Sequence, residues 1–141
     1  MKITKWFNSD VIYESEKKTL RETLEEAVRK KIDLSGSNLR NSNLRNSNLR
    51  NSDFSGSNLR NSNLSGSDFR NSDLSGSDFR NSNFSDSDLS DSDLSGSDFS
   101  GSNLRNSDLY HAHFYGRGGK TKIKTSQIEA FHKALGIVVK D

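Results

Sequence analysis

Residues 52–71 read SDFSG SNLRN SNLSG SDFRN, four copies of one five-residue pattern. In each copy the first residue is Ser, the second is Asp or Asn, the third is Leu or Phe, and the fifth is Gly or Asn. The large apolar residue returns at every fifth position from Leu34 to Phe114, which makes seventeen pentads in one register. A period of five matches neither a helix, at about 3.6, nor a strand, at about two. It indicates short extended segments joined by corners.

The composition makes sense only in the light of this repeat. Of the 141 residues, 29% are hydrophobic and 28% charged, a balance that would otherwise indicate disorder. Strict periodicity reverses that interpretation. The absence of cysteine excludes disulfides, thiol catalysis and thiolate metal sites. A net charge of +2 favours neither a nucleic-acid partner nor a membrane, and no apolar run resembles a signal peptide or a bilayer span, so we expect a cytoplasmic protein.

The pattern closely resembles the pentapeptide-repeat family, whose usual repeat is Ala, then Asp or Asn, then Leu or Phe, then two variable residues. The resemblance covers residues 32–116. It implies an all-β fold, a right-handed quadrilateral β-helix of about four coils in which the large residue and the small residue two before it point inward. Ser stands where the family usually has Ala, which predicts rows of hydroxyl groups inside the coils.

The corners of such a coil are encoded locally. A type II turn needs a positive φ at its third residue, which Gly adopts freely and Asn better than most residues. That place is filled by Gly36, Asn41, Asn46, Asn51, Gly56 and their successors. We expect the coils to stack about 4.8 Å apart with main-chain hydrogen bonds between them.

Residues 1–31 are predicted to cover the first coil. Ile3–Phe7 and Val11–Tyr13 have the pattern of a hairpin. Thr19 and Glu22 form a capping box that predicts a helix from Leu20 to about Lys30.

Residues 117–141 are predicted to form a second cap or a dimerisation element. Ser126 and Glu129 resemble a capping box, Gly136 is placed to end the helix, and residues 137–139 have the pattern of a strand. An apolar stripe runs along this helix and supplies the predicted dimer contacts, Ile128, Phe131 and Leu135. The stripe indicates either a homodimer or a helix that folds back over the last coil.

Outward side chains sort into columns when twenty residues make one coil. Residues 32–114 hold seven Arg and eleven Asp, whereas both ends of the chain are positive. Two columns form the predicted interaction surface: Asp33, Asp53, Asp73 and Asp93 on one face, and Arg40, Arg60 and Arg80 on the next. Stacked carboxylates repel one another, which predicts raised pKa values unless arginines offset the effect.

A metal-site hypothesis concerns the last corner, where His111 and His113 stack over Asp91 and Asp93. Imidazole and carboxylate groups suit a divalent metal. The alternative is that these residues mark the transition from repeat to cap. Nothing in the sequence indicates any other cofactor.

No enzyme motif stands out: serine is abundant but repetitive, and no Gly-x-Ser-x-Gly elbow is present. The sequence therefore predicts a non-catalytic scaffold or protein-interaction module with a protein partner that it does not identify. The family resemblance implies one alternative, a DNA mimic that binds DNA gyrase or another type II topoisomerase. Direct nucleic-acid binding is disfavoured because the Asp columns repel phosphates.

Overall fold

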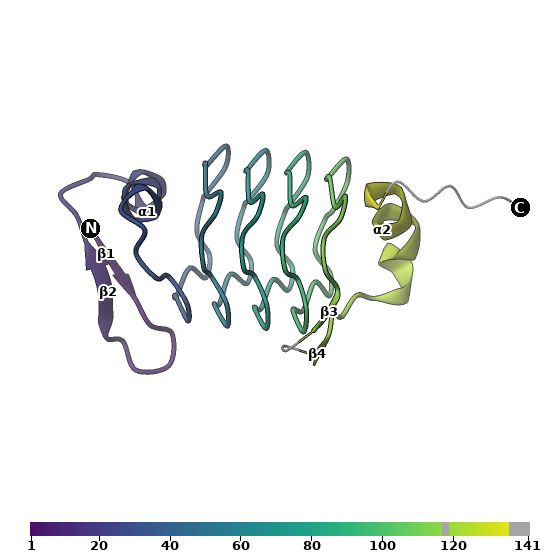
Figure 1. Cartoon of the computed structure of the whole chain (residues 1–141), viewed down its shortest axis with the longest axis horizontal. Helices are drawn as coiled ribbons and strands as arrows, with labels where there is room; N and C mark the ends of the chain where they lie inside the picture. The colour runs from purple at the N-terminus through teal and green to yellow at the C-terminus, as the bar shows by residue number, and fades with distance from the viewer. Residues whose placement is uncertain (117–118, 136–141) are drawn as a thin grey trace, which may run out of the picture.

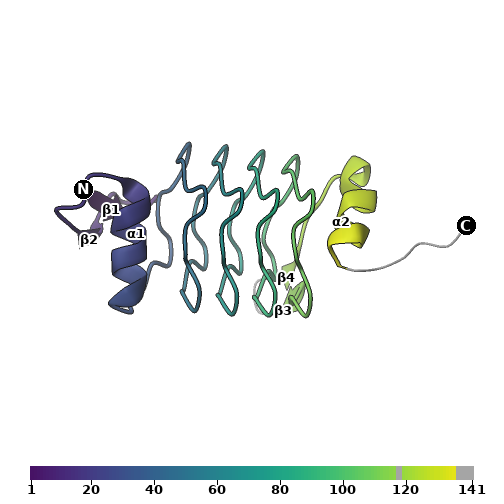
Figure 2. The ribbon, with the colours of Figure 1, turned by 90° about the horizontal axis from the view of Figure 1, so that it is seen from above.

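Stacked coils form the body of the molecule in the computed structural model, which describes residues 1–116 and 119–135 (Figure 1). The coils lie in a row along the long axis. A hairpin and a helix lie at the N-terminal end, and a second helix lies at the other (Figures 1 and 2). The two helices are therefore separated by the length of the repeat.

Each coil takes twenty residues and has four sides. Parallel bridges join residues twenty apart on every side, as in Asp53–Asp73, Asn58–Asp78, Asn63–Asn83 and Asp68–Asp88. On the first side the Phe54 N–H donates to the Asp73 carbonyl at 2.8 Å, and the Asp73 N–H donates to the Ser52 carbonyl at 2.9 Å. The seventeen pentads thus wind into just over four coils.

The large apolar residue of each pentad points inward, as predicted. Every one from Leu34 to Leu109 is at most 2% exposed. The phenylalanines contact one another between coils and within them: Phe79 stacks on Phe99 at 4.8 Å between centroids and meets Phe84 edge-on at 5.0 Å. The core is thus a narrow column of rings and isobutyl groups along the solenoid axis.

The inward serines carry the predicted rows of hydroxyls, and hydrogen bonds satisfy them. The Ser82 hydroxyl donates to the Leu59 carbonyl at 2.6 Å and accepts from the Ser62 N–H at 3.3 Å. Similar bonds recur at Ser67, Ser72, Ser77 and Ser107. Because its hydroxyl bonds to a main-chain carbonyl of the preceding coil, Ser fits a position that the family usually gives to Ala.

The corners have the predicted backbone. Gly66 has φ +67°, and the non-glycine residues at corners all have φ between 55° and 59°: Asn41, Asn46, Asn51, Asn61, Asn71, Asn81, Asp86, Asp91, Asn106 and His111. The turn hydrogen bond, for example from the Ser67 N–H to the Leu64 carbonyl at 3.1 Å, closes around the residue with positive φ. That is the arrangement of a type II turn.

At the N-terminal end β1 (Lys2–Thr4) pairs with β2 (Val11–Glu14), and α1 (Leu20–Arg29) lies across the first coil (Figure 2). The capping box of Thr19 and Glu22 is present, and Leu24 and Ala27 are fully buried. The first strand is shorter than the predicted Ile3–Phe7. Beyond Thr4 the chain leaves the hairpin to pair with the first coil, because the Asn38 N–H donates to the Thr4 carbonyl at 2.8 Å and Lys5 forms a bridge with Ser37.

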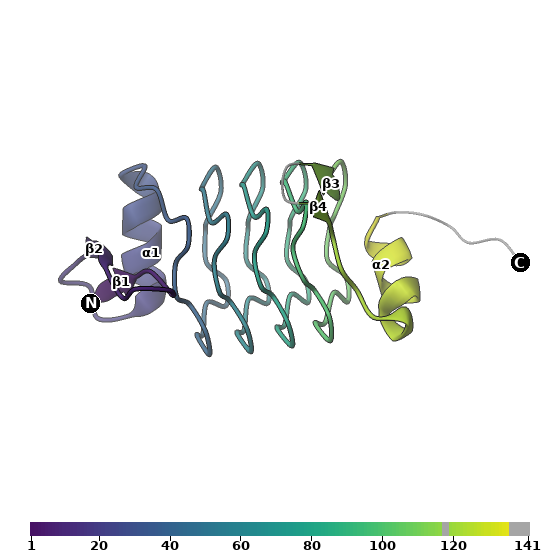
Figure 3. The same ribbon diagram turned by 90° about the horizontal axis from the view of Figure 1, so that it is seen from below.

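At the other end a small hairpin, β3 (Tyr115–Gly116) and β4 (Gly119–Lys120), lies beside the last coil (Figure 3). A 3-10 turn, η1 (Thr125–Gln127), leads into α2 (Ile128–Ala134). The predicted capping box of Ser126 and Glu129 is wrong: Ser126 lies within η1, Glu129 lies in the first turn of α2, and α2 starts without a side-chain cap. Gly136 and the predicted strand at 137–139 lie outside the described residues.

The Gln127 side chain, rather than the predicted capping box, makes the hydrogen bonds before α2. Its side-chain amide donates to the Phe99 and Ser102 carbonyls at 2.9 and 2.7 Å, and its oxygen accepts from the Gly101 and Lys124 N–H groups at 2.9 and 2.8 Å. One side chain thereby joins the turn before α2 to backbone groups of the last coil.

Candidate interaction surface

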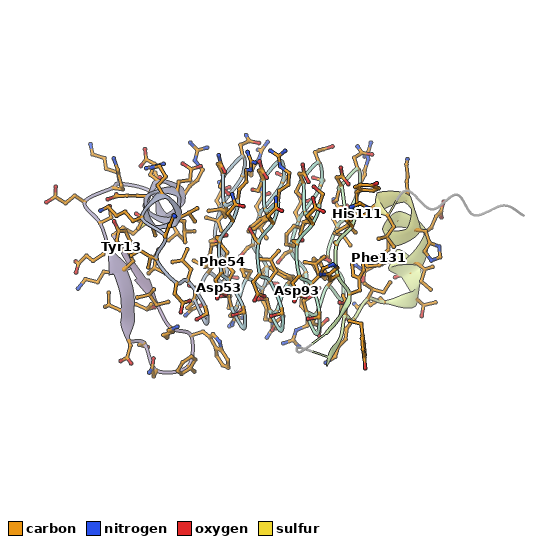
Figure 4. All side chains as sticks on the ribbon, viewed as in Figure 1. Tyr13, Asp53, Phe54, Asp93, His111 and Phe131 are labelled. Carbon is orange, nitrogen blue, oxygen red and sulfur yellow. The ribbon has the colours of Figure 1, made fainter. Side chains whose placement is uncertain are left out.

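The Asp column of the first face runs straight along the solenoid. Backbone bridges join Asp53 to Asp73, Asp73 to Asp93, and Asp93 to His113. Asp53 and Asp93 lie at the same level of the solenoid in Figure 4. Each carboxylate accepts the N–H of the residue two further on at 2.8 to 2.9 Å, from Ser35, Ser55, Ser75 and Ser95. One oxygen of each carboxylate is thus tied to a corner.

On two other faces, aspartates alternate with arginines in ladders. On the second face Asp78 lies between Arg60 (3.8 Å) and Arg80, and Arg80 reaches on to Asp98 (3.8 Å). On the fourth face Asp68 lies between Arg50 (3.6 Å) and Arg70 (2.6 Å), and Arg70 reaches on to Asp88 (3.3 Å). Arg50, Arg60, Arg70 and Arg80 are therefore paired with aspartates of their own face, whereas no ion pair is formed by Arg40 in the part of the chain that the structure describes.

These ladders lower carboxylate pKa values. Burial raises the pKa of Asp68 and of Asp78, but the hydrogen bonds from Arg70 and Arg80 and the neighbouring positive charges outweigh it, so both pKa values lie below the ordinary value. The pKa of Asp33 is lowered too, chiefly by the Ser35 N–H. At Asp68 and Asp78 arginines thus have the offsetting effect that the sequence analysis allowed for, and at Asp33 a backbone N–H lowers the pKa instead.

The first face lacks such a ladder. Among the side chains of residues 1–115 and 121–135, no Lys, Arg or His nitrogen lies within 4.0 Å of the Asp53 or Asp73 carboxylate oxygens. Asp33, at the start of the column, is close enough to Lys5 for the lysine's charge to help lower the Asp33 pKa. The solenoid therefore has one acidic face without arginine and two ion-paired faces.

An open cleft of about 860 Å³ borders the start of this face, between α1 and the first coils. Its walls hold three acidic residues, Glu25, Asp33 and Asp53, and three basic residues, Arg29, Lys31 and Arg50. The sequence did not predict it, because it depends on how α1 crosses the coil. Its balanced charge selects neither anions nor cations.

The residues of the metal-site hypothesis lie on either side of a corner of the coil. His111 pairs with Asp91 (Nδ1 to Oδ1, 3.5 Å) and stacks on Tyr110 at 3.8 Å between centroids. His113 lies on the next face over Asp93, and Figure 4 places His111 well away from Asp93. In the part of the chain that the structure describes, no group of three or more His, Cys, Asp or Glu side chains could hold a metal ion. The two histidines therefore do not share one site.

The repeat region matches a known protein family. The family model described as pentapeptide repeats (8 copies) matches residues 30–66, 47–86, 62–101 and 87–116, which together make up more than half of the chain. The chain belongs to the pentapeptide-repeat family. No curated protein matches it.

Solved structures of other pentapeptide-repeat proteins have the same architecture. Rfr23 from the cyanobacterium Cyanothece 51142 is 24% identical, with a TM-score of 0.62 over 67% of this chain and 62% of its own. HetL, involved in heterocyst differentiation regulation in Nostoc sp. strain PCC 7120, is 28% identical over 58% of this chain and 37% of its own, with a TM-score of 0.41. QnrB1, a plasmid-mediated fluoroquinolone resistance protein, is 18% identical over 79% of this chain and 73% of its own, with a TM-score of 0.39.

The likeness to Rfr23 bears on the fold and not on the role. The likeness to Rfr23 agrees with the right-handed quadrilateral β-helix expected of this pentapeptide-repeat protein. The chain spans less than two thirds of the length of Rfr23 and of HetL. No helix of the described residues is long and apolar enough to cross a membrane.

The apolar stripe of α2 turns inward in this pentapeptide-repeat protein. Phe131 meets Phe114 edge-on at 5.1 Å, and Leu135 also packs against the core. Ile128 stays 40% exposed. The stripe therefore covers the last coil within one chain, as the second alternative from the sequence had it, and the homodimer stays a prediction.

Trp6 and Phe7, which the sequence predicts to lie in a strand, are exposed instead. Trp6 and Phe7 are 52% and 61% exposed, next to the corner of the acidic face. Their only sequence signal was two adjacent rings before the Asn8-Ser9-Asp10 turn. That signal does not distinguish a buried strand end from an exposed loop.

Proposed function

We propose that this protein is a non-catalytic, rigid scaffold that binds a partner protein through its acidic face. The observation that supports the proposal is the contrast between faces. Asp68 and Asp78 are paired with arginines, whereas among the described side chains no cationic nitrogen lies within 4.0 Å of the Asp53 or Asp73 carboxylate. A face that is held straight by coil-to-coil hydrogen bonds presents these charges at a fixed spacing, which favours a specific partner.

The chemistry of the serines supports a non-catalytic role. Inward hydroxyls donate to main-chain carbonyls, as Ser82 does, and several outward ones bond to their own corner, as Ser90 does to Asp88 at 2.6 Å. In the described part of the chain no histidine is hydrogen-bonded to a serine hydroxyl, the pairing that would activate it as a nucleophile.

The test is affinity capture from the source cell with charge-reversed variants. The double variant Asp53→Lys and Asp73→Lys should lose the captured partner. Its matched control, Asp86→Lys and Asp108→Lys, reverses the same number of charges at other corners and sides and should retain it. Equal capture by all three proteins would refute the acidic face as the binding surface.

A further inference from the structure

The exposed Trp6–Phe7 pair needs an explanation. Large aromatic side chains normally bury most of their surface, and a fixed exposed group of them marks a site of interaction. In this protein both rings remain more than half exposed although the core of the first coil lies close by. The pair therefore serves neither the core nor the hairpin's own pairing.

Both rings are held in place. The Trp6 indole N–H donates to the Gly56 carbonyl in the second coil at 2.8 Å. The two rings meet edge-on, with centroids 5.6 Å apart and planes at 86°. A Cβ at Gly36 would lie 3.1 Å from a Phe7 ring carbon, which is tighter than an ordinary contact, so the ring packs closely against this corner. Aromatic groups fixed before binding lose little entropy on contact, which is what makes them effective anchors.

The corner beneath the rings belongs to the acidic face. Gly56 and Gly76 each stand three residues after an aspartate of the column, Asp53 and Asp73. Beyond the rings the corner is open, because a Cβ at Gly76 would meet no atom within 4 Å. An anchored aromatic pair and the carboxylates of Asp53 and Asp73, which have no cationic nitrogen within 4.0 Å among the described side chains, thus share one edge of the solenoid.

We propose that Trp6, Phe7, Asp53 and Asp73 form a docking site for an extended, arginine- or lysine-rich segment of a partner protein. Guanidinium and ammonium groups are the side chains that both pair with carboxylates and stack on aromatic faces. Coils repeat about every 4.8 Å and same-side residues of an extended peptide about every 6.8 Å, so neighbouring basic side chains reach neighbouring aspartates. An apolar segment would leave the carboxylates desolvated and unpaired. The inference rests on the proposed function and adds the chemistry of the partner.

The probe is a labelled peptide of alternating arginine and serine, about twelve residues long, with a glutamate-serine peptide of equal length as its control. Trp6 is the only tryptophan of the chain, so its fluorescence reports on this site alone. The arginine peptide should change that fluorescence in a saturable way that weakens with salt, and the glutamate peptide should not.

Variants separate a docked peptide from general attraction, with anisotropy of the labelled peptide as the readout. We expect Asp53→Asn with Asp73→Asn, and separately Trp6→Ala, to weaken binding at least about tenfold. Asn keeps the corner hydrogen bond, as Asn58 does with the Arg60 N–H at 3.2 Å. The control Asp86→Asn with Asp108→Asn removes equal charge elsewhere, at positions whose columns already hold Asn46 and Asn48, and should bind within about twofold of the parent protein.

Several results would overturn the inference. They are no binding at low salt, an equal loss in the Asp86 and Asp108 control, or unchanged affinity in Trp6→Ala. Light scattering that shows a dimer dissociated by Trp6→Ala would assign the site to a second copy and overturn it as well. If the partner captured from cells is lost with Asp53→Lys and Asp73→Lys but kept with Trp6→Ala, this inference fails while the proposed function stands.

Discussion

The inward side chains of the coils repeat the same interactions, whereas the outward side chains differ from face to face. Inside, the pentads from Leu39 to Leu109 repeat one arrangement, a buried apolar side chain and a serine whose hydroxyl is hydrogen-bonded within the solenoid. Outside, faces built from the same repeat differ: one carries carboxylates without arginine, and two carry ion-paired ladders. The inside therefore accounts for the stability of this protein, and its function must be sought in the differences between the faces.

The largest expected effect is on the inside. Phe79→Asp places a carboxylate between Phe84 and Phe99, where no partner is available, and should destabilise the fold by at least about 4 kcal/mol. Thermal melting by circular dichroism measures it. Phe79→Leu is the control, because Leu59 holds the equivalent place one coil earlier, and it should cost much less. An unchanged melting temperature for Phe79→Asp would contradict the inward assignment.

The repeat could be predicted from the sequence because its information is local. Each pentad carries its own inward residue and its own corner, so register and columns follow from counting. The ends could not be predicted as well. The role of Gln127 depends on carbonyls of Phe99 and Ser102, which lie more than twenty residues away in sequence. The capping motif at Ser126 offered a strong but misleading local signal.

The acidic face could be predicted only in part. Counting by twenty placed the Asp column correctly and set arginines near aspartates. It did not reveal that Arg70 contacts both Asp68 and Asp88, because that depends on side-chain conformation. It also missed the exposure of Trp6, which depends on the carbonyl of Gly56 in another coil.

The corners, where inside and outside meet, should show a smaller effect. Gly76→Ala forces alanine to a φ near +64° in open space and should cost about 1 kcal/mol. Gly66→Ala should cost more, because its Cβ would lie 2.4 Å from the Asn46 side-chain oxygen, which must then move. Urea denaturation compares the two. Stabilisation by Gly76→Ala would show that the corner backbone is not strained for a residue with a Cβ.

The faces themselves should differ less still. Asp78→Asn leaves Arg80 with only the more distant carboxylate of Asp98 and should cost at most about 1 kcal/mol near neutral pH, since the pair is partly exposed and screened. Asp73→Asn keeps the hydrogen bond to the Ser75 N–H and removes a charge from a row of like charges, so it should not destabilise. Equal destabilisation by both variants would contradict the distinction between the faces.

Lowering the pH should remove the difference in folding stability between the parent protein and Asp78→Asn. The pKa of Asp78 is lowered in the folded protein, so its contribution to stability is complete above the unfolded pKa, about 3.9, and is lost as the pH falls through the folded pKa. Stability of the parent and of Asp78→Asn should therefore converge below about pH 4. The pKa of Glu26 is lowered to about 2, chiefly by the Lys30 hydrogen bond. The contribution of Glu26 to stability is therefore lost as the pH falls from about 4.5 to 2, and the cost of Glu26→Gln should shrink in acid in the same way. A gap that widens in acid would contradict this assignment.

The smallest expected effect concerns DNA gyrase, the alternative target that the family resemblance implied. Purified protein should inhibit supercoiling by gyrase poorly, at either of two ionic strengths and across increasing concentration. Clear inhibition at low micromolar protein, abolished by Asp53→Lys with Asp73→Lys but not by Asp86→Lys with Asp108→Lys, would replace the scaffold function by DNA mimicry.

We expect poor inhibition because the acidic column has a low charge density, and not because arginines weaken its negative charge. The ladders neutralise Arg60 and Arg80 with aspartates of their own face, so those arginines weaken the acidic column little. Just over four coils at about 4.8 Å nevertheless give a rod only about 20 Å long. Its column offers one carboxylate per coil, whereas duplex DNA carries one charge per about 1.7 Å of its axis. A column with about a third of that density suits a few basic side chains of a protein better than a surface shaped to hold duplex DNA.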